Sequence, residues 1–362
     1  MKEGRLYPRE TFWRDHQPWL KENGYLLRPR YQPDWVASWI KDPTTKRIFC
    51  EDGHVAPWEH ILDAIRISDG VQVMLKRIEL AKSPKEVEIG RMFSSPPLVS
   101  DPRNHCAGTW DVLKIPDKND EFIIVMPLLQ EFENPPFETV GEVVDLCRQL
   151  FEGLQFMHSN NVAHRDCKCN NIMMDGAPLY SQPVHPLLPG TRRDWAGTVK
   201  PSTRTRIPVK YYFVDFGLSR KYDDGVVRLQ RPPWGGDRTV PEFAKGDPCN
   251  PFPVDVYCLG NVIRSYFLEG DHIHPATRSF SFIKELIDDM VQDDPKARPN
   301  MDEVVNRFAI IHRNLSTWTL RSRIVNADES RITGIFRSFS HWTKQIAFIT
   351  KGAPPLPSSS RR

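Results

Sequence analysis

The arrangement of apolar and polar residues predicts β-strands between residues 46 and 125. Two apolar runs, 61–67 and 71–78, flank the turn signal SDG at 68–70, which predicts a β-hairpin. The second run places Lys76 among aliphatic side chains. A lysine buried in a strand needs an anionic partner, whereas a lysine on an edge strand points to solvent.

A helix is expected next, with Ser83 as its N-cap and Pro84 as its first residue. Glu86 shares the apolar face of this helix with Phe93, whereas Glu88 lies about 200° away at about 100° per residue. We therefore expect Glu86 to be the partner of Lys76. The alternative is a capping box between Ser83 and Glu86, which leaves Glu88 for the lysine.

Further apolar runs predict a strand at 121–129, a helix at 139–159 and short strands at 172–174 and 211–214. Near the C-terminus, apolar residues recur three or four positions apart, which predicts an amphipathic helix. The stripe consists of Ile332, Ile335, Phe339, Trp342, Ile346 and Ile349. We expect it to pack against the preceding domain, with a membrane surface or a partner protein as alternatives.

The segment 176–210 interrupts this pattern. It contains six prolines, six basic residues and one acidic residue, without sustained periodicity. This composition predicts an extended or disordered loop whose replacement by a short turn leaves stability nearly unchanged. If the loop has a role, its charge favours an acidic partner. Residues 1–45 are rich in aromatic side chains and are predicted to form an N-terminal extension packed on the core, with a peptide-binding surface as the alternative.

Composition narrows the classes of function. The 362 residues are 40% hydrophobic and 26% charged, as in globular proteins. A net charge of +3 gives no reason to expect a nucleic-acid partner, and no apolar run reaches the length of a transmembrane segment. The first residues do not resemble a signal peptide. Seven irregularly spaced cysteines favour a reducing, cytoplasmic compartment over a disulfide framework. No second pair of ligands accompanies Cys167 and Cys169, which argues against zinc.

The chemistry is concentrated in residues 164–171. Asp166 is followed by Lys168 and by Asn171, and Asp215 arrives on a separate apolar strand. Phosphoryl transfer from ATP uses such a set: a carboxylate for the hydroxyl proton, a carboxylate and an amide for Mg²⁺, and a cation near the phosphate.

The order and spacing of these residues match H-R-D-x-x-x-x-N followed by D-F-G. The chain therefore resembles the protein kinase superfamily over roughly residues 55–313. Lys168 is typical of the serine/threonine type, and the nearest likeness is to the atypical protein-kinase-like proteins of fungi. Four further positions match motifs of the family in the right order. They are Lys76, Glu242, Asp255 and Arg298.

The resemblance implies an α+β, two-lobed protein-kinase-like fold, with an N-lobe at 46–127, a C-lobe at 128–313 that carries the insert 176–210, and a tail at 314–362. It also implies ATP and Mg²⁺ as cofactors and a protein substrate. Lys76, oriented by Glu86, would hold the α- and β-phosphates.

The same resemblance assigns roles to the other residues. Asp166 would be the catalytic base, Lys168 the cation that neutralises phosphate charge, and Asn171 and Asp215 the Mg²⁺ ligands. Met126 would be the gatekeeper beside the adenine, Leu129 would offer its N–H, and Glu242 and Arg298 would form a buried ion pair.

The sequence departs from the motifs of the protein kinase family at three places that concern the binding of substrates. No G-x-G-x-x-G precedes Lys76, Gly235 stands where the family has a threonine, and few residues separate Asp255 from Arg298. A pseudokinase that acts as a binding or scaffolding module is therefore the alternative function. A kinase that phosphorylates a small molecule is the third hypothesis.

Overall fold

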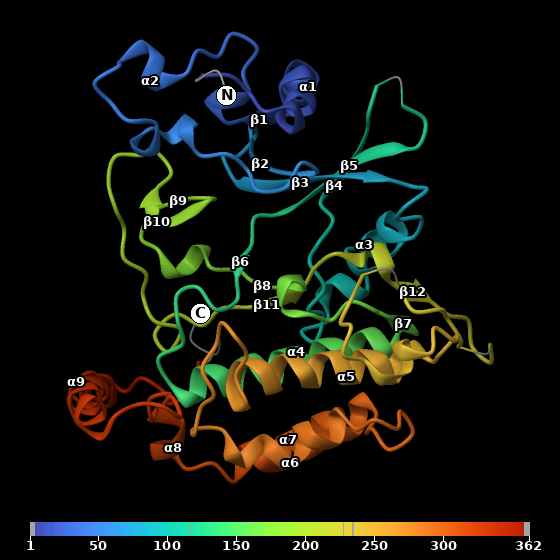
Figure 1. Cartoon of the computed structure of the whole chain (residues 1–362), viewed down its shortest axis with the longest axis vertical. Helices are drawn as coiled ribbons and strands as arrows, with labels where there is room; N and C mark the ends of the chain where they lie inside the picture. Colours follow the sequence, from blue (N-terminus) through green and yellow to red (C-terminus); the bar gives the residue numbers. More distant parts are fainter. Residues whose placement is uncertain (1–3, 117, 227, 234, 358–362) are drawn as a thin grey trace. The chain divides into compact units, whose positions relative to one another are not determined.

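The structure is a computed structural model, and it describes residues 4–116, 118–226, 228–233 and 235–357. The fold is of the α+β type, with antiparallel sheets and helices (Figure 1). Two compact units can be distinguished. Unit 1 comprises Met1–Val87, Gly108–Leu129 and Tyr180–Lys200, and unit 2 comprises Glu88–Ala107, Gln130–Leu179 and Pro201–Arg362. The division of the sequence at residues 45, 127 and 313 stays a prediction.

The α-helices are α1 (Thr11–Glu22), α2 (Ser38–Lys41), α3 (Glu86–Phe93), α4 (Val140–Ser159), α5 (Pro251–Ile263), α6 (Lys284–Met290), α7 (Met301–Arg313), α8 (Thr317–Arg321) and α9 (Arg331–Thr350). The strands are β1 (Tyr25–Leu27), β2 (Ile61–Arg66), β3 (Gln72–Glu79), β4 (Asp111–Lys114), β5 (Glu121–Pro127), β6 (Gln130–Glu131), β7 (Val162–Ala163), β8 (Ile172–Met174), β9 (Val184–His185), β10 (Leu188–Arg192), β11 (Tyr211–Phe213) and β12 (Arg220–Lys221).

Unit 1 is built on a five-stranded sheet with the order β1-β2-β3-β5-β4. The predicted hairpin is confirmed, since β2 and β3 pair in antiparallel register and Gly70 provides a positive φ of 71° in the turn. One face of the sheet is apolar and packs against α1, which contributes Trp13 and Leu20 to the core. Residues 1–45, expected as an extension, therefore supply both the edge strand β1 and this covering helix.

The insert 176–210 is ordered, which corrects the expectation of an extended or disordered loop. Its first part forms the antiparallel pair β9–β10 within unit 1. The Nε2 atom of Gln72 donates a hydrogen bond to the carbonyl of Val184, at 3.1 Å, and the indole N–H of Trp195 donates to Phe49, at 2.8 Å. These contacts hold the pair on the sheet and on the connection between β1 and β2.

The second part of the insert is buried in unit 2. Arg204, 1% exposed, donates to the carbonyl of Phe132 at 2.8 Å and lies 4.2 Å from the ring centroid of Phe137. The backbone N–H and hydroxyl of Thr205 both donate to Glu142, which is itself buried. Composition gave no sign of this, because the partners lie far away in sequence.

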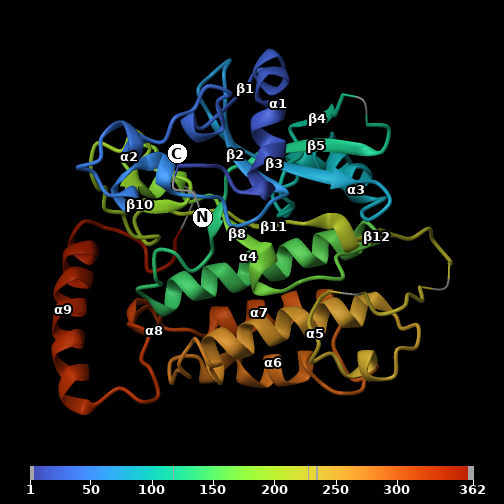
Figure 2. The ribbon, with the colours of Figure 1, turned by 45° about the horizontal axis from the view of Figure 1, so that its top comes forward.

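Unit 2 is mainly helical. Helix α4 is buried along most of its length and starts at the N-cap Thr139, as predicted. Helices α5, α6 and α7 pack together beside it (Figure 2). Strands β11, β8 and β6 form a small sheet, and β12 pairs with β7. Arg298 and Glu242 form a two-bonded ion pair at 2.7 and 2.8 Å, and the Arg298 side chain is completely buried.

Helix α9 forms where the apolar stripe predicted it, but its packing differs from the expectation. The stripe residues Ile332, Ile335 and Phe339 are 71%, 68% and 74% exposed, whereas Gln345 is completely buried. The helix therefore packs through its polar side. No helix in the described part of the chain is long and apolar enough to cross a membrane.

Candidate active site

The loop that carries Asp166 is held by one buried carboxylate. Asp255, in α5, accepts hydrogen bonds from the backbone N–H groups of His164 at 2.7 Å and of Arg165 at 2.6 Å. It also lies 3.1 Å from Nε2 of His158. Arg165 adopts φ = 68°, a left-handed conformation that is unfavourable for an arginine unless surrounding contacts fix it. Asp255 supplies such contacts on the N-terminal side of the loop.

The carboxylate of Asp166 has one occupied and one free oxygen. Its Oδ2 accepts a hydrogen bond from Nδ2 of Asn171 at 2.7 Å and lies 3.0 Å from Nζ of Lys168. Its Oδ1 is buried, and no described residue donates a hydrogen bond to it. A buried carboxylate oxygen without a donor is unfavourable unless a ligand supplies the hydrogen. The geometry is that of an acceptor prepared for a hydroxyl proton.

Asp215 is placed next to this loop by strand pairing. Strand β11 pairs with β8, and the N–H of Val214 donates to the carbonyl of Asn171 at 3.0 Å. Asp215 itself adopts φ = 66°, and its Oδ1 accepts from the N–H of Gly217 at 3.3 Å. The adjacent ring of Phe216 lies 5.7 Å from that of His164. Pairing thus brings two predicted metal ligands, Asn171 and Asp215, to neighbouring strands.

The donor set suits Mg²⁺ that is bound together with phosphates. Asn171 uses its amide nitrogen for Asp166, so only its amide oxygen would be available to a metal ion. Among the residues that the structure describes, no three His, Cys, Asp or Glu side chains gather as a self-sufficient metal site. Mg²⁺ commonly takes one or two protein oxygens and completes its shell with water and substrate phosphates. One carboxylate and one amide oxygen fit that pattern.

In unit 1, Lys76 is paired with Glu86. The Nζ of Lys76 lies 2.5 Å from Oε1 of Glu86, and both side chains are at most 10% exposed. This is the ion pair that the helical face predicted. Helix α3 begins at Glu86 rather than at Pro84, so the predicted N-terminus was two residues too early. Ser83 still accepts the backbone N–H of Glu86 through its carbonyl, at 3.3 Å.

Met126 lies opposite Met74 in the β3–β5 pair, two positions along from the partner of Lys76. Because side chains alternate across a sheet, Met126, Met74 and Lys76 share one face. Leu129 follows the strand and is buried. The structure thus places Met126 on the sheet face that carries the Lys76 ion pair.

The same face of the sheet borders a cavity of about 580 Å³ in unit 1. Its lining combines apolar residues of β1 and β2 with polar and aromatic residues of the β1–β2 connection and the insert. The lining includes Arg28, Glu51, Asp63, Ile65, His185 and Trp195. A volume of this order is typical of small-molecule sites in proteins.

Arg28 is the centre of a buried network in this cavity. It donates to Asp63 at 3.1 Å and to the carbonyl of His54 at 2.9 Å, and lies 3.4 Å from Glu51. Burial raises the pKa of the Asp63 carboxyl, although the charge of Arg28 opposes that shift. Burial also acts to raise the pKa of Glu51, but the hydrogen bond from His185 and the charge of Arg28 lower it overall.

The connection between β1 and β2 contains a single glycine, Gly53. It spans residues 28–60 and contains α2 together with three short 3-10 helices. Sequence reasoning noticed the missing glycines but did not find this network. The available signal was the polar pair Arg28 and Asp63 within apolar strand segments, since buried charges require partners.

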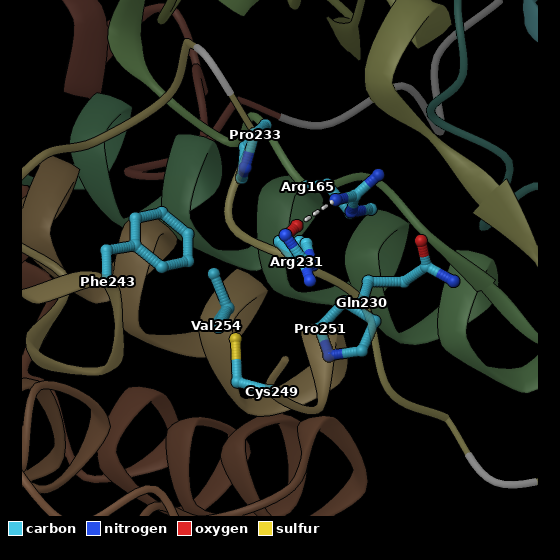
Figure 3. Close-up of a pocket in the computed structure, with 8 residues that line it drawn as sticks. All are labelled: Arg165, Gln230, Arg231, Pro233, Phe243, Cys249, Pro251 and Val254. Atoms are coloured by element: carbon cyan, nitrogen blue, oxygen red, sulfur yellow. Dashed lines mark hydrogen bonds between the residues drawn. The ribbon is translucent and has the colours of Figure 1, made fainter. Parts of the chain in front are cut away.

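Arg165 borders a much smaller cavity in unit 2 (Figure 3). Its guanidinium donates to the carbonyls of Leu218 at 3.0 Å and Arg231 at 2.8 Å. The cavity measures about 10 Å³ and is lined by Arg165, Gln230, Arg231, Pro233, Phe243, Cys249, Pro251 and Val254. It has room for about one water molecule, so it is no substrate site.

The segment beyond this cavity passes close to Asp166. A β-carbon built on Gly236 would lie 3.6 Å from Oδ1 of Asp166 and 3.7 Å from the carbonyl oxygen of Arg165. Gly236 also has φ = 86°, which favours glycine. The position where the family has threonine is Gly235. The free oxygen of Asp166 therefore faces a stretch of backbone without side chains.

Comparison with known proteins agrees with this geometry. Residues 111–279 match the family described as protein kinase domain. "Probable serine/threonine-protein kinase ireA" of Dictyostelium discoideum is 26% identical over 187 residues, which cover 46% of this chain and 16% of that protein. "Serine/threonine-protein kinase PAK 1" of Mus musculus is 28% identical over 130 residues, or 32% of this chain and 22% of that protein.

The fold of unit 2 and the loop at 164–171 agree with the match to a protein kinase domain at residues 111–279. Residues 111–279 match the protein kinase domain, and both relatives are described as serine/threonine kinases, which confirms the resemblance found in the sequence. The chain spans less than a quarter of the length of the two relatives named above.

Proposed function

We propose that the chain is a cytoplasmic serine/threonine protein kinase of two-lobed fold that transfers the γ-phosphate of Mg-ATP to protein hydroxyl groups. The observation that carries this proposal is the half-free carboxylate of Asp166. Its Oδ2 is fixed by Asn171 and Lys168, while Oδ1 is buried without a donor. A pseudokinase would not need to preserve an oriented base of this kind.

Each step has a residue to support it. Oδ1 of Asp166 accepts the proton of the substrate hydroxyl group while the oxygen of that hydroxyl group attacks the γ-phosphorus. The bond from that phosphorus to the bridging oxygen breaks, and ADP leaves. Lys168 offsets negative charge near the transferred group, and Lys76, held by Glu86, binds the α- and β-phosphates. Mg²⁺ on Asn171 and Asp215, when bound, neutralises charge on the phosphates.

The base of ATP would lie on the Lys76 face of the sheet. Met126 and the N–H of Leu129 are the proposed contacts, and the 580 Å³ cavity extends this face toward Trp195. Pro127 has no N–H and can offer only its carbonyl.

The proposal is tested by nucleotide-dependent stabilisation. Mg-ATP at 100 times its Kd should add about 2.7 kcal/mol to the free energy of unfolding, and EDTA should remove most of the effect. Asp215→Asn should make the stabilisation by ATP less dependent on Mg²⁺. Asp223→Asn, at an exposed position eight residues further along the sequence, should behave as wild type. Equal stabilisation by ATP with and without Mg²⁺ would contradict the metal site.

A second function, a pseudokinase that acts as a binding module, is favoured by one observation. Residues 28–60 replace the glycine-rich loop, and two carboxylates, Glu51 and Asp63, are held there by Arg28. Stabilisation by nucleotide without transfer of radiolabel from [γ-³²P]ATP to the chain or to a generic protein substrate would support this function. Label on a small molecule instead would support the third hypothesis.

A further inference from the structure

Helix α9 is attached to unit 2 through its polar side. The side chain of Gln345 is completely buried, Nη1 of Arg321 lies 3.4 Å from its amide oxygen, and Nε2 of His341 lies 2.7 Å from the carbonyl oxygen of Arg321. Nε of Arg323 donates to the hydroxyl of Ser338 at 2.9 Å. These contacts fix which side of the helix faces the protein.

The side of the helix next to this buried one is apolar and exposed. Its six side chains are between 41% and 74% exposed, and α9 lies beside α8 at one end of unit 2 in both views (Figures 1 and 2). The set consists of Ile332, Ile335, Phe336, Phe339, Ile346 and Ile349. A contiguous apolar face of this kind marks an interaction surface, unlike single exposed apolar residues.

The helix is held in this orientation at both ends. Before it, Glu329 accepts hydrogen bonds from Arg323 and, at 3.1 Å, from Arg337. After it, Arg321 donates to the carbonyl of Ala353, and a β-carbon on Gly141 would lie 2.4 Å from the carbonyl oxygen of Pro355. The chain on both sides of α9 is thus fastened to unit 2, so the apolar face cannot turn inward without breaking several contacts.

The charge of α9 indicates what covers this face. Residues 331–351 contain four basic residues and no acidic residue. Two of the four are neutralised, Arg337 by Glu329 and Lys344 by Glu138 at 2.6 Å. Arg331 and Lys351 make no ion pair with any residue that the structure describes. At about 100° per residue they lie roughly 80° and 120° from Phe339, on opposite edges of the apolar face.

We propose that α9 lies flat on an anionic lipid bilayer, with its apolar side chains among the acyl chains and Arg331 and Lys351 at the headgroups. Amphipathic helices with basic edges bind anionic membranes in this way. Trp318, 65% exposed and 5.3 Å from the ring of Trp342, adds an aromatic side chain suited to the interface. A second copy is disfavoured, because two α9 helices face to face would bring only basic edges together.

The test is sedimentation of the full chain with vesicles of phosphatidylserine and phosphatidylcholine, or of phosphatidylcholine alone. We expect binding to the anionic vesicles and much weaker binding to the neutral ones. The double variant Phe336→Glu/Phe339→Glu should lower the partition coefficient on anionic vesicles by about tenfold or more. Ile273→Glu, at a 75% exposed position of unit 2 outside α9, is the matched control and should bind as wild type.

Charge reversal separates the electrostatic contribution of the basic residues from the contribution of the apolar side chains. Each of Arg331→Glu and Lys351→Glu should weaken binding to anionic vesicles by about fivefold and leave the weak binding to neutral vesicles unchanged. Circular dichroism and melting should match wild type, because all the substituted residues are exposed. Absence of vesicle binding, equal binding to both vesicles, or dimerisation in ultracentrifugation that Phe336→Glu/Phe339→Glu abolishes would each overturn the proposal.

Discussion

The catalytic loop, residues 164–171, and the β1–β2 connection, residues 28–60, are both irregular in backbone but are stabilised in different ways. The catalytic loop is held by Asp255, which binds two consecutive backbone N–H groups, and by the bond from Asn171 to Asp166. The β1–β2 connection is held by charged side chains, with Arg28 bridging Asp63 and Glu51.

The difference reflects what each region has to do. Proton transfer requires one oxygen at a defined place. Hydrogen bonds from the backbone to Asp255 fix the position of Asp166 well, because few rotatable bonds separate the bonded backbone from the carboxylate. Covering a nucleotide requires only a surface, which several arrangements of residues can provide. On the proposed function, the residues for the chemistry are present, whereas the region that would cover the nucleotide lacks the glycine-rich motif of the family.

The largest expected effect on stability comes from the insert, whose first part packs in unit 1 and whose second part packs in unit 2. Replacing residues 178–208 by a short Gly/Ser turn removes both donors to Oε1 of Glu142 and the contacts of His185 and Trp195. We expect a loss of roughly 3–5 kcal/mol, mainly from the uncompensated buried carboxylate. Thermal and urea unfolding measure this loss in the free energy of unfolding.

The sequence alone predicted the opposite outcome for this replacement. A shortened chain with unchanged stability would show that the insert is a passive loop and that it does not stabilise either unit. A smaller replacement, of residues 188–196 only, spares Arg204 and Thr205 and should affect unit 1 alone.

Arg28→Met tests the β1–β2 connection directly. The substitution leaves Asp63 and Glu51 without their cation, and we expect a loss of roughly 3–5 kcal/mol in the free energy of unfolding. Arg66→Met is the matched control, because its pair with Asp69 is solvent-exposed and such pairs contribute little to stability. Similar losses in both variants would mean that the buried network does not stabilise the connection.

Asp255→Asn tests the anchor of the catalytic loop. An amide can accept through only one oxygen, so one of the two backbone N–H groups loses its acceptor. We expect about 1–3 kcal/mol of destabilisation and a fall in kcat of about 10²-fold, because small displacements of a base are costly. Asp288→Asn, in an exposed helix pair with Lys284, serves as control. An unchanged kcat in Asp255→Asn would show that the loop keeps its geometry without this anchor.

The smallest expected effect is a pH dependence of the Arg28→Met loss. Burial already raises the pKa of Asp63, and removing Arg28 should raise it further. Stability of the variant should then fall as pH rises from the unfolded pKa through the raised folded pKa. The loss should therefore be smaller at pH 5 than at pH 8, whereas a loss that is independent of pH would mean that Asp63 finds another partner.

The same two regions explain how much could be predicted from the sequence. The proposed base, its cation and one proposed metal ligand, Asp166, Lys168 and Asn171, lie within a span of six residues, so their spacing was visible along the chain. Lys76 and Glu86 were also close enough to be paired by helical and strand periodicity. His185 and Glu51 are 134 positions apart, and neither stands in a pattern that indicates the other.

Helices α4 and α9 show the same limit for the fold. Both have 20 residues and an apolar stripe, and both were predicted as helices. Periodicity identifies the apolar face of a helix but not the surface that it contacts. The apolar residues of α4 are buried and most of those of α9 are exposed, because polar side chains of α9 find partners in Arg321 and Arg323.

The most direct test of the account compares wild type with Asp166→Asn under Mg-[γ-³²P]ATP and a generic protein substrate. The amide keeps the shape of the side chain but cannot accept the proton, so turnover should fall about 10²–10⁴-fold. Nucleotide-dependent stabilisation should persist in the variant, and Asn170→Ala, at the exposed neighbour of Asn171, should retain activity. Equal activity in Asp166→Asn and wild type, or no transfer by either, would contradict the assignment of this chain as an active kinase with Asp166 as its base.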